Sequence, residues 1–133
     1  MPSSQKEDNM KAWIGSVTMA GLLVSGGAAM ADGNLLLAQC QASLQMLETT
    51  PKSPPDFNAG SCFGTVGAVM DTMTALYYDL PKEAKACFPE SGIQYGQAVR
   101  IVTRYMSEHP ASLHQSGAML SIEAFKAAYP CSK

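Results

Sequence analysis

The chain of 133 residues lacks several signals that would mark an enzyme, a metal protein or a nucleic-acid binder. It has no Cys-x-x-Cys pair, no nucleophile elbow, no zinc-helix motif and no paired-carboxylate arrangement, so catalysis and a metal site are both disfavoured. Nine basic and eleven acidic residues leave a net charge of −2, which argues against nucleic acid or an anionic membrane as partner. We therefore expect no enzyme activity, no cofactor and no bound metal.

Sustained alternation of apolar and polar residues is also missing, so a β-sheet is not expected. Apolar residues instead recur every three or four positions, which is typical of amphipathic helices. With mostly short connections, these helices predict an all-α, single-domain antiparallel bundle of about four helices. We expect Asn34 and Ser61 to cap the first two helices. The expected helices are Asn34–Glu48, Ser61–Leu80, Ile93–Glu108 and Ser116–Ala128.

The N-terminal residues have the composition of an export signal. Lys11 precedes the uncharged run Ala12–Ala31, which ends in the small-residue pattern Ala-Met-Ala. We therefore expect a signal peptide over residues 1–31, cleaved after Ala31, and a mature exported domain over residues 32–133. Met10 is the alternative translation start, because the residues before it carry acidic side chains. An uncleaved membrane anchor is the less favoured alternative, given the Gly and Ser content of the run.

All four cysteines follow the predicted leader, and an even number in an oxidising compartment indicates two disulfides. Cys40 and Cys62 lie on either side of the proline-rich connection between the first two helices. Cys87 and Cys131 fall at the same end of an up-and-down bundle. We favour the pairings Cys40–Cys62 and Cys87–Cys131, although four cysteines allow three pairings and the sequence alone does not choose between them.

Other residues each allow a functional and a structural interpretation. His109 and His114 are the only histidines, too few for an evident metal cluster. His109 more simply ends the third helix before Pro110, with its ring near the last carbonyls. Met70 and Met73 are favoured as core residues over copper ligands, because they lie in an apolar stripe.

Three residues of the second helix predict contacts with its neighbours. Gly64 and Gly67 suggest close approach of another backbone, because glycine is unfavourable inside a helix by about 1 kcal/mol. Asp71 is favoured as a structural carboxylate that pairs with a neighbouring helix or caps a loop, and a partner contact is the alternative.

Most of the mature chain resembles one known family. The ten residues from Cys62 to Asp71 resemble the Cys-x-Gly-Tyr-Ile-x-Gly-Val-x-Asp motif of the Rap/Tai family of type VI secretion immunity proteins. Thr65 and Ala68 depart from it, where the family has Tyr and Gly, and the proline loop before Cys62 is longer than usual. Later residues follow the family's order and approximate spacing: Cys87-Phe88-Pro89, Gly92, Gln97, Tyr105, His109-Pro110 and Tyr129-Pro130-Cys131.

The resemblance implies a periplasmic, often dimeric protein that binds a peptidoglycan-cleaving amidase effector and blocks its active-site cleft. The polar connections Lys52–Gly60 and Glu108–Ser116 are then the candidate contact segments, because loops on a rigid scaffold commonly carry binding residues. The residues expected to contact the amidase are Lys52, Asp56, Glu108, His109 and His114.

Two other hypotheses remain open. The first is a non-inhibitory periplasmic protein, structural or chaperone-like, that uses the same helical scaffold, because fold does not establish function. A chaperone would bind several unfolded clients weakly, whereas an immunity factor would bind one enzyme tightly. The second is a periplasmic metal binder, which would retain its metal through dialysis.

Overall fold

The computed structural model describes residues 32–49, 54 and 56–132. This part of the chain forms four α-helices and two short 3₁₀ helices, with no strand among the described residues. The all-α, single-domain prediction is confirmed, while the predicted signal peptide lies outside the described residues. The elements are α2 (Gly33–Glu48), α3 (Phe57–Ala75), η1 (Lys82–Ala84), α4 (Tyr95–Glu108), η2 (Pro110–Ser112) and α5 (Gly117–Ala128).

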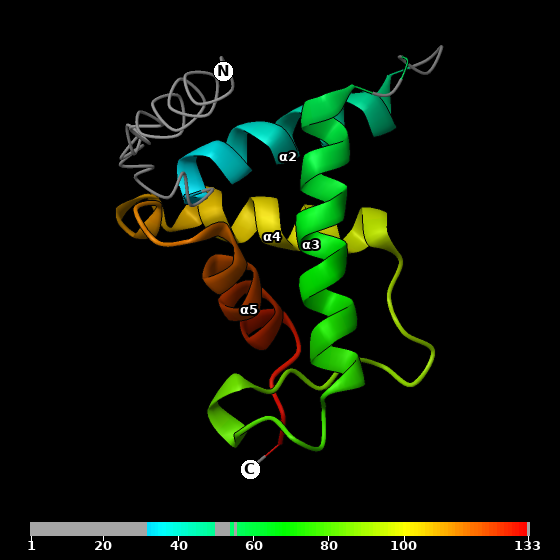
Figure 1. Ribbon diagram of the computed structural model, residues 1–133, viewed down its shortest axis with the longest axis vertical. Helices are drawn as coiled ribbons and strands as arrows, with labels where there is room; N and C mark the ends of the chain where they lie inside the picture. The colour runs from blue at the N-terminus through cyan, green and yellow to red at the C-terminus, as the bar shows by residue number, and fades with distance from the viewer. Residues whose placement is uncertain (1–31, 50–53, 55, 133) are drawn as a thin grey trace, which may run out of the picture.

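The four helices contact one another around a common centre. Figure 1 shows α3 standing upright, with α2 and α4 passing across it and α5 beside its lower half. The segment between α3 and α4 and the C-terminal tail lie together below the helices. Within the described residues, no helix is both long enough and apolar enough to cross a bilayer.

Aspartates begin the first two helices of the described chain. The side chain of Asp32 accepts a hydrogen bond from Leu35 N at 3.0 Å, and that of Asp56 accepts one from Ala59 N at 2.6 Å. Each bond satisfies one of the amide groups that a helix N-terminus leaves unpaired. The predicted caps Asn34 and Ser61 were therefore wrong. Helix α3 begins one turn earlier than expected and ends at Ala75, before the expected Leu80.

The later helix ends follow the predicted signals more closely. Ser116 caps α5 through the amide of Met119 at 3.3 Å. Helix α4 ends at Glu108, directly before His109 and Pro110, as predicted, because proline disfavours helical geometry in the residue before it. The start of α4 at Tyr95 is two residues later than expected.

The core lies where the four helices meet. Its largest members are fully buried and come from all four helices, so each helix depends on the other three for burial of its apolar face. Met70 and Met73 are also buried in the core, as predicted. The largest fully buried apolar side chains are Phe125, Leu36, Met106, Leu120, Val66, Val99 and Val102.

Both predicted disulfides are confirmed. Cys40–Cys62 joins α2 to α3, and Cys87–Cys131 joins the segment after η1 to the C-terminal tail. The Cα atoms are 5.0 Å apart in each pair. The first pair is fully buried, whereas the second is partly exposed.

Candidate functional site

The C-terminal end of α4 brings together two of the predicted contact residues. Glu108 is the last residue of the helix and His109 follows as its C-cap, both exposed. The His109 ring stacks on Tyr105 with 4.0 Å between ring centroids, and its Nδ1 lies 2.7 Å from the Tyr105 carbonyl oxygen. Because a carbonyl only accepts, Nδ1 is the donor in this contact. The predicted position of this imidazole, near the last carbonyls of the helix, is confirmed.

His114 lies further along the same connection, between η2 and α5, and is exposed. Its Nδ1 is 3.0 Å from the Ala111 carbonyl oxygen, so this nitrogen is also the donor. The connection itself is anchored to the start of α2, where the Asn34 side chain donates to the Leu113 carbonyl at 3.2 Å. The loop therefore presents its histidines from a fixed backbone.

A groove runs between α4 and α5, and Glu108 is part of its lining. It has a volume of about 270 Å³. Three alanines of α5 leave the space open, and longer side chains of α4 form the opposite wall. The lining residues are Ile101, Arg104, Tyr105, Glu108, Ala124, Ala127 and Ala128.

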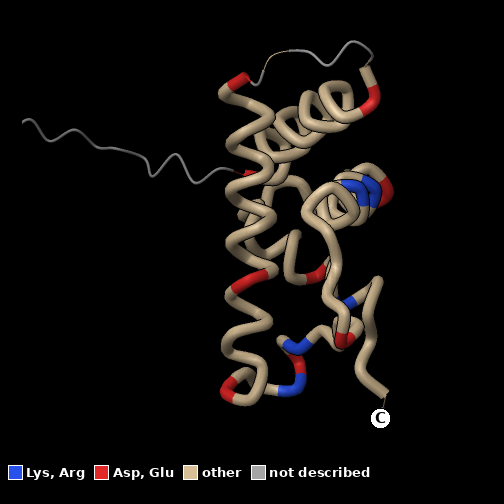
Figure 2. Tube along the Cα trace, turned by 90° about the vertical axis from the view of Figure 1, so that its right-hand side faces the viewer, with Lys and Arg blue, Asp and Glu red and all other residues tan. Residues whose placement is uncertain are grey.

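Arg104 and Glu108 form an ion pair at the rim of this groove. Arg104 Nε donates to Glu108 Oε1 at 2.8 Å, one helical turn away. This hydrogen bond, with the nearby negative charge, raises the pKa of the Arg104 guanidinium above its usual value. Figure 2 shows basic positions on α4, whereas the one charged residue within α3 is Asp71. The groove thus combines an apolar floor with one charged group of each sign.

The other predicted contact segment lies elsewhere. Asp56 is at the N-terminus of α3, far from the α4–α5 connection (Figure 1). Its carboxylate is engaged in the helix cap described above. Residues 57–60, expected in the loop, form the first turn of α3, and Lys52 lies outside the described residues. The structure therefore does not bring the two predicted segments into one surface.

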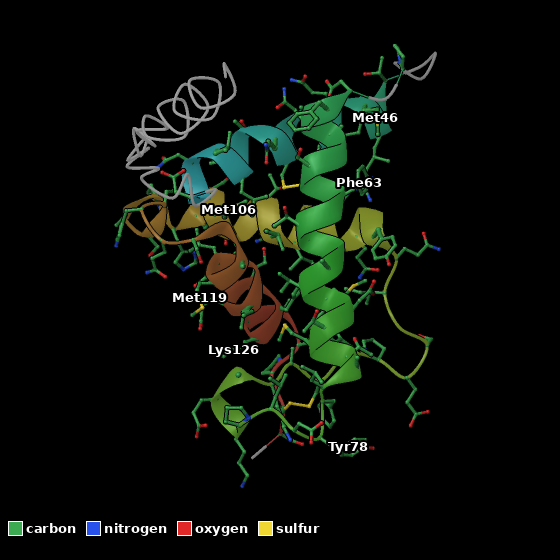
Figure 3. All side chains as sticks on the ribbon, viewed as in Figure 1. Met46, Phe63, Tyr78, Met106, Met119 and Lys126 are labelled. Carbon is green, nitrogen blue, oxygen red and sulfur yellow. A yellow bond between two sulfur atoms is a disulfide. The ribbon has the colours of Figure 1, made fainter. Side chains whose placement is uncertain are left out.

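A second groove, with a volume of about 250 Å³, runs along the other side of α5 against α3 and η1. Its lining is apolar apart from one threonine. Leu76 and Tyr78, just beyond the end of α3, are also exposed, and Tyr78 is 91% accessible (Figure 3). The lining residues are Ala68, Val69, Thr72, Met73, Leu80, Ala84 and Ile122.

Neither groove is lined by a cluster of side chains that could bind a metal ion. Among the described residues, no group of three or more His, Cys, Asp or Glu side chains is close enough to hold an ion. All four cysteines are oxidised, so none is a thiolate nucleophile or ligand. What the two grooves offer is surface for contact with another molecule.

A family model matches residues 32–131, and its description is Rap1a immunity proteins. The chain belongs to this family. The match spans all four helices and both disulfides. Searches of curated proteins and of solved structures each gave no match.

Membership in the Rap1a family implies that the protein binds a partner effector. Glu108, His109 and His114 share the connection that ends at α5, next to the charged groove. Sequence reasoning missed Arg104 and the alanines of α5. The four-residue spacing of Arg104 and Glu108 could have predicted an ion pair on one face of the helix. The groove could not be predicted in this way, because it depends on how α5 packs against α4.

Asp71, the other ambiguous residue, has a structural role in this Rap1a protein. Its carboxylate accepts a hydrogen bond from the Tyr95 hydroxyl at 2.6 Å, which links α3 to the first residue of α4. The bond raises the pKa of Tyr95 above its usual value, because loss of the phenol proton would place two negative charges together. The structural interpretation of Asp71, a contact with a neighbouring helix, is thus supported.

Proposed function

We propose that the protein is exported, loses residues 1–31 and protects the periplasm as an immunity protein against a type VI secreted peptidoglycan amidase. It binds the amidase and blocks the active-site cleft sterically, without catalysis of its own. The observation that carries this proposal is the family match over residues 32–131. Two disulfides add support for an oxidising compartment, because such bonds are rare in the cytosol.

The α4–α5 connection and the groove beside it are the contact surface that we favour. They carry the exposed residues Glu108, His109 and His114, and Glu108 also lines the groove with Arg104 and the alanines of α5. Such a mixture is typical of protein-contact surfaces, where an apolar centre is bordered by polar groups. The Asp56 end of α3, with Lys52 before it, is the alternative contact surface.

The test uses a small cysteine murein amidase as the probe, taken from the neighbouring genes if one is encoded there. We expect the two proteins to elute as one complex, the amidase to stop cleaving murein at one equivalent, and co-expression in the periplasm to restore viability. No complex, with murein cleavage unchanged at tenfold excess, would contradict the proposal. Weak binding to several unfolded proteins would instead favour the chaperone-like alternative.

Export is tested separately by the intact mass of the protein purified from the periplasm. We expect a chain that begins at Asp32. A mass that retains residues 10–31 would indicate an uncleaved anchor and would contradict the proposed maturation.

We also propose a homodimer, in which a second copy covers the apolar groove between α3 and α5. The segment from Asp79 to Lys85 beside this groove carries two acidic and two basic residues, so two copies related by a two-fold axis would bring opposite charges together. Sedimentation should give twice the mass of one chain. The Tyr78→Asp variant should sediment with the mass of a single chain. A monomer at 100 µM or so would contradict the dimer.

A further inference from the structure

The charged groove between α4 and α5 has chemistry that suggests what it binds. Both arginines of the chain, Arg100 and Arg104, lie on α4 one turn apart and are exposed. Among the described residues that line the groove, Arg104 is the only basic one. Arginine is favoured at protein interfaces because its planar guanidinium can hold a carboxylate by two parallel hydrogen bonds.

The pairing of Arg104 with Glu108 uses only part of this capacity. The bond to Glu108 uses Nε, so the two amino groups of the guanidinium can still meet an incoming carboxylate. The side chains of Arg104 and Glu108 are 80% and 54% exposed. Exposed pairs of this kind contribute little to stability, and a competing carboxylate in a less hydrated position can therefore displace Glu108.

The apolar floor of the groove places a second requirement on the segment that binds there. Ile101 and the three alanines of α5 offer apolar surface between the charged rim and the helix backbones. A segment that fills the groove must therefore carry a small apolar side chain next to its acidic group. A purely acidic segment would leave this floor hydrated.

We infer that the α4–α5 groove receives an acidic segment of the partner protein, with one apolar side chain on the groove floor and a carboxylate that replaces Glu108 on Arg104. Glu108 acts as an internal stand-in for the partner's carboxylate. This inference rests on the proposed function in one respect, namely that the partner is the amidase effector.

Three variants separate this arrangement from a general effect of charge. Arg104→Ala should raise the dissociation constant for the amidase at least about tenfold, because a buried carboxylate loses its partner. Arg100→Ala makes the same change of charge on the same helix but outside the groove lining, so it should change the constant less than about threefold. Glu108→Gln removes the internal competitor and should tighten binding by about twofold to fivefold.

Two results would overturn the inference. Equal losses for Arg104→Ala and Arg100→Ala would mean that only long-range attraction is at work. Weaker binding by Glu108→Gln would mean that Glu108 itself contacts the partner, as the sequence first suggested.

A second experiment does not need the amidase. The exported protein is titrated in an NMR experiment with acetyl-Asp-Leu-Ala-Glu-amide, and with acetyl-Lys-Leu-Ala-Lys-amide as the matched control. We expect the acidic peptide alone to shift the amide signals of Ile101, Ala124 and Ala127, and Arg104→Ala to abolish these shifts. Shifts with both peptides, or none with the acidic one, would contradict an acid-binding groove.

The two experiments fail in different ways. Binding of the acidic peptide without binding of the amidase would remove the proposed function but retain the groove chemistry. Tight binding of the amidase, unaffected by Arg104→Ala and without peptide shifts, would retain the proposed function and remove the groove as its contact.

Discussion

The two disulfides differ in what surrounds them. Cys40–Cys62 is fully buried and joins α2 to α3 within the core. Cys87–Cys131 is partly exposed and joins a segment without regular structure to the C-terminal tail. Around it, Phe88 packs against Phe125 and Tyr129, with ring centroids 5.4 Å apart in each pair.

This contrast separates two uses of a disulfide. The buried bridge reinforces helices that already pack on each other. The exposed bridge holds a connection of about twenty residues that has few helical hydrogen bonds of its own, helped by the bond from Cys87 N to the Tyr129 carbonyl at 2.8 Å. Loop closure alone predicts contributions of about 3 kcal/mol for the separation of 22 residues and about 4 kcal/mol for 44.

The largest effect on stability is expected when both cysteines of one disulfide are replaced by alanine. Cys40→Ala with Cys62→Ala should lower the free energy of unfolding by about 4–5 kcal/mol, because loop closure and buried packing are both lost. Cys87→Ala with Cys131→Ala should cost only about 2–3 kcal/mol, because the tail can detach while the four helices stay folded. Chemical denaturation of the two variants measures both values.

Loop length alone predicts the opposite order for these two variants. A greater loss from the Cys87–Cys131 pair would therefore show that separation along the chain, and not burial, determines the contribution of each bridge.

The two bridges should also differ in their response to reductant. Thiol–disulfide exchange needs access to a sulfur atom, so Cys87–Cys131 should open at least about tenfold faster than Cys40–Cys62 in dilute dithiothreitol. Alkylation followed by peptide mass analysis identifies the cysteines labelled at each time. Equal rates at all four cysteines would mean that both bridges open only when the whole domain unfolds.

The packing of α3 beyond Cys62 can be tested with its two glycines. Space around Gly64 is open, so Gly64→Ala should stabilise the protein by about 0.5–1 kcal/mol through helix propensity. A Cβ at Gly67 would lie 3.1 Å from Cε1 of Tyr95, whose hydroxyl is bonded to Asp71. We expect Gly67→Ala to bring no such stabilisation, because the Tyr95 ring must move to make room for the new methyl group. Thermal unfolding of both variants measures the difference in their stabilities.

Equal stabilisation by both glycine substitutions would show that the Tyr95 ring yields without cost. The prediction that both glycines admit another backbone was wrong. A Cβ added at Gly64 would meet no other element within 4 Å, and at Gly67 the nearest neighbour is the Tyr95 side chain.

Periodicity and helix-end signals predicted most of this fold. The apolar stripes located the four helices, Pro110 located the end of α4, and the positions of the cysteines favoured the pairings found. The start of α3 was missed because prolines 51, 54 and 55 suggested a longer loop. Proline excludes a helical interior at its own position, but Asp56 directly after the last proline is still free to cap.

The candidate site was less accessible from the sequence. Glu108 and His109 could be located because a helix end exposes them. The groove beside them forms because Ala124, Ala127 and Ala128 of α5 face α4. That arrangement depends on how α5 packs against α4, which the sequence of either helix alone does not show. The proposed replacement of Glu108 by a partner carboxylate on Arg104 depends on the same packing.

The smallest expected effect is a loss of stability at low pH. It should affect the Asp32 cap at the start of α2 but not the two disulfides. The hydrogen bond from Leu35 N holds the pKa of Asp32 below its ordinary value of 3.8. A folded-state pKa below the unfolded one means that the cap contributes its full stability above about pH 4 and loses it as the pH falls through the folded pKa. Disulfides do not titrate, so the contribution of either bridge should stay constant over the same range.

Hydrogen exchange of the Leu35 amide between pH 5 and pH 2.5, corrected for intrinsic rates, measures this loss. Asp32→Asn is the matched control, because asparagine caps a helix without titrating. We expect Leu35 protection to fall with pH in the original chain and to stay level in the variant. The same fall in Asp32→Asn would show that the acid response does not come from Asp32.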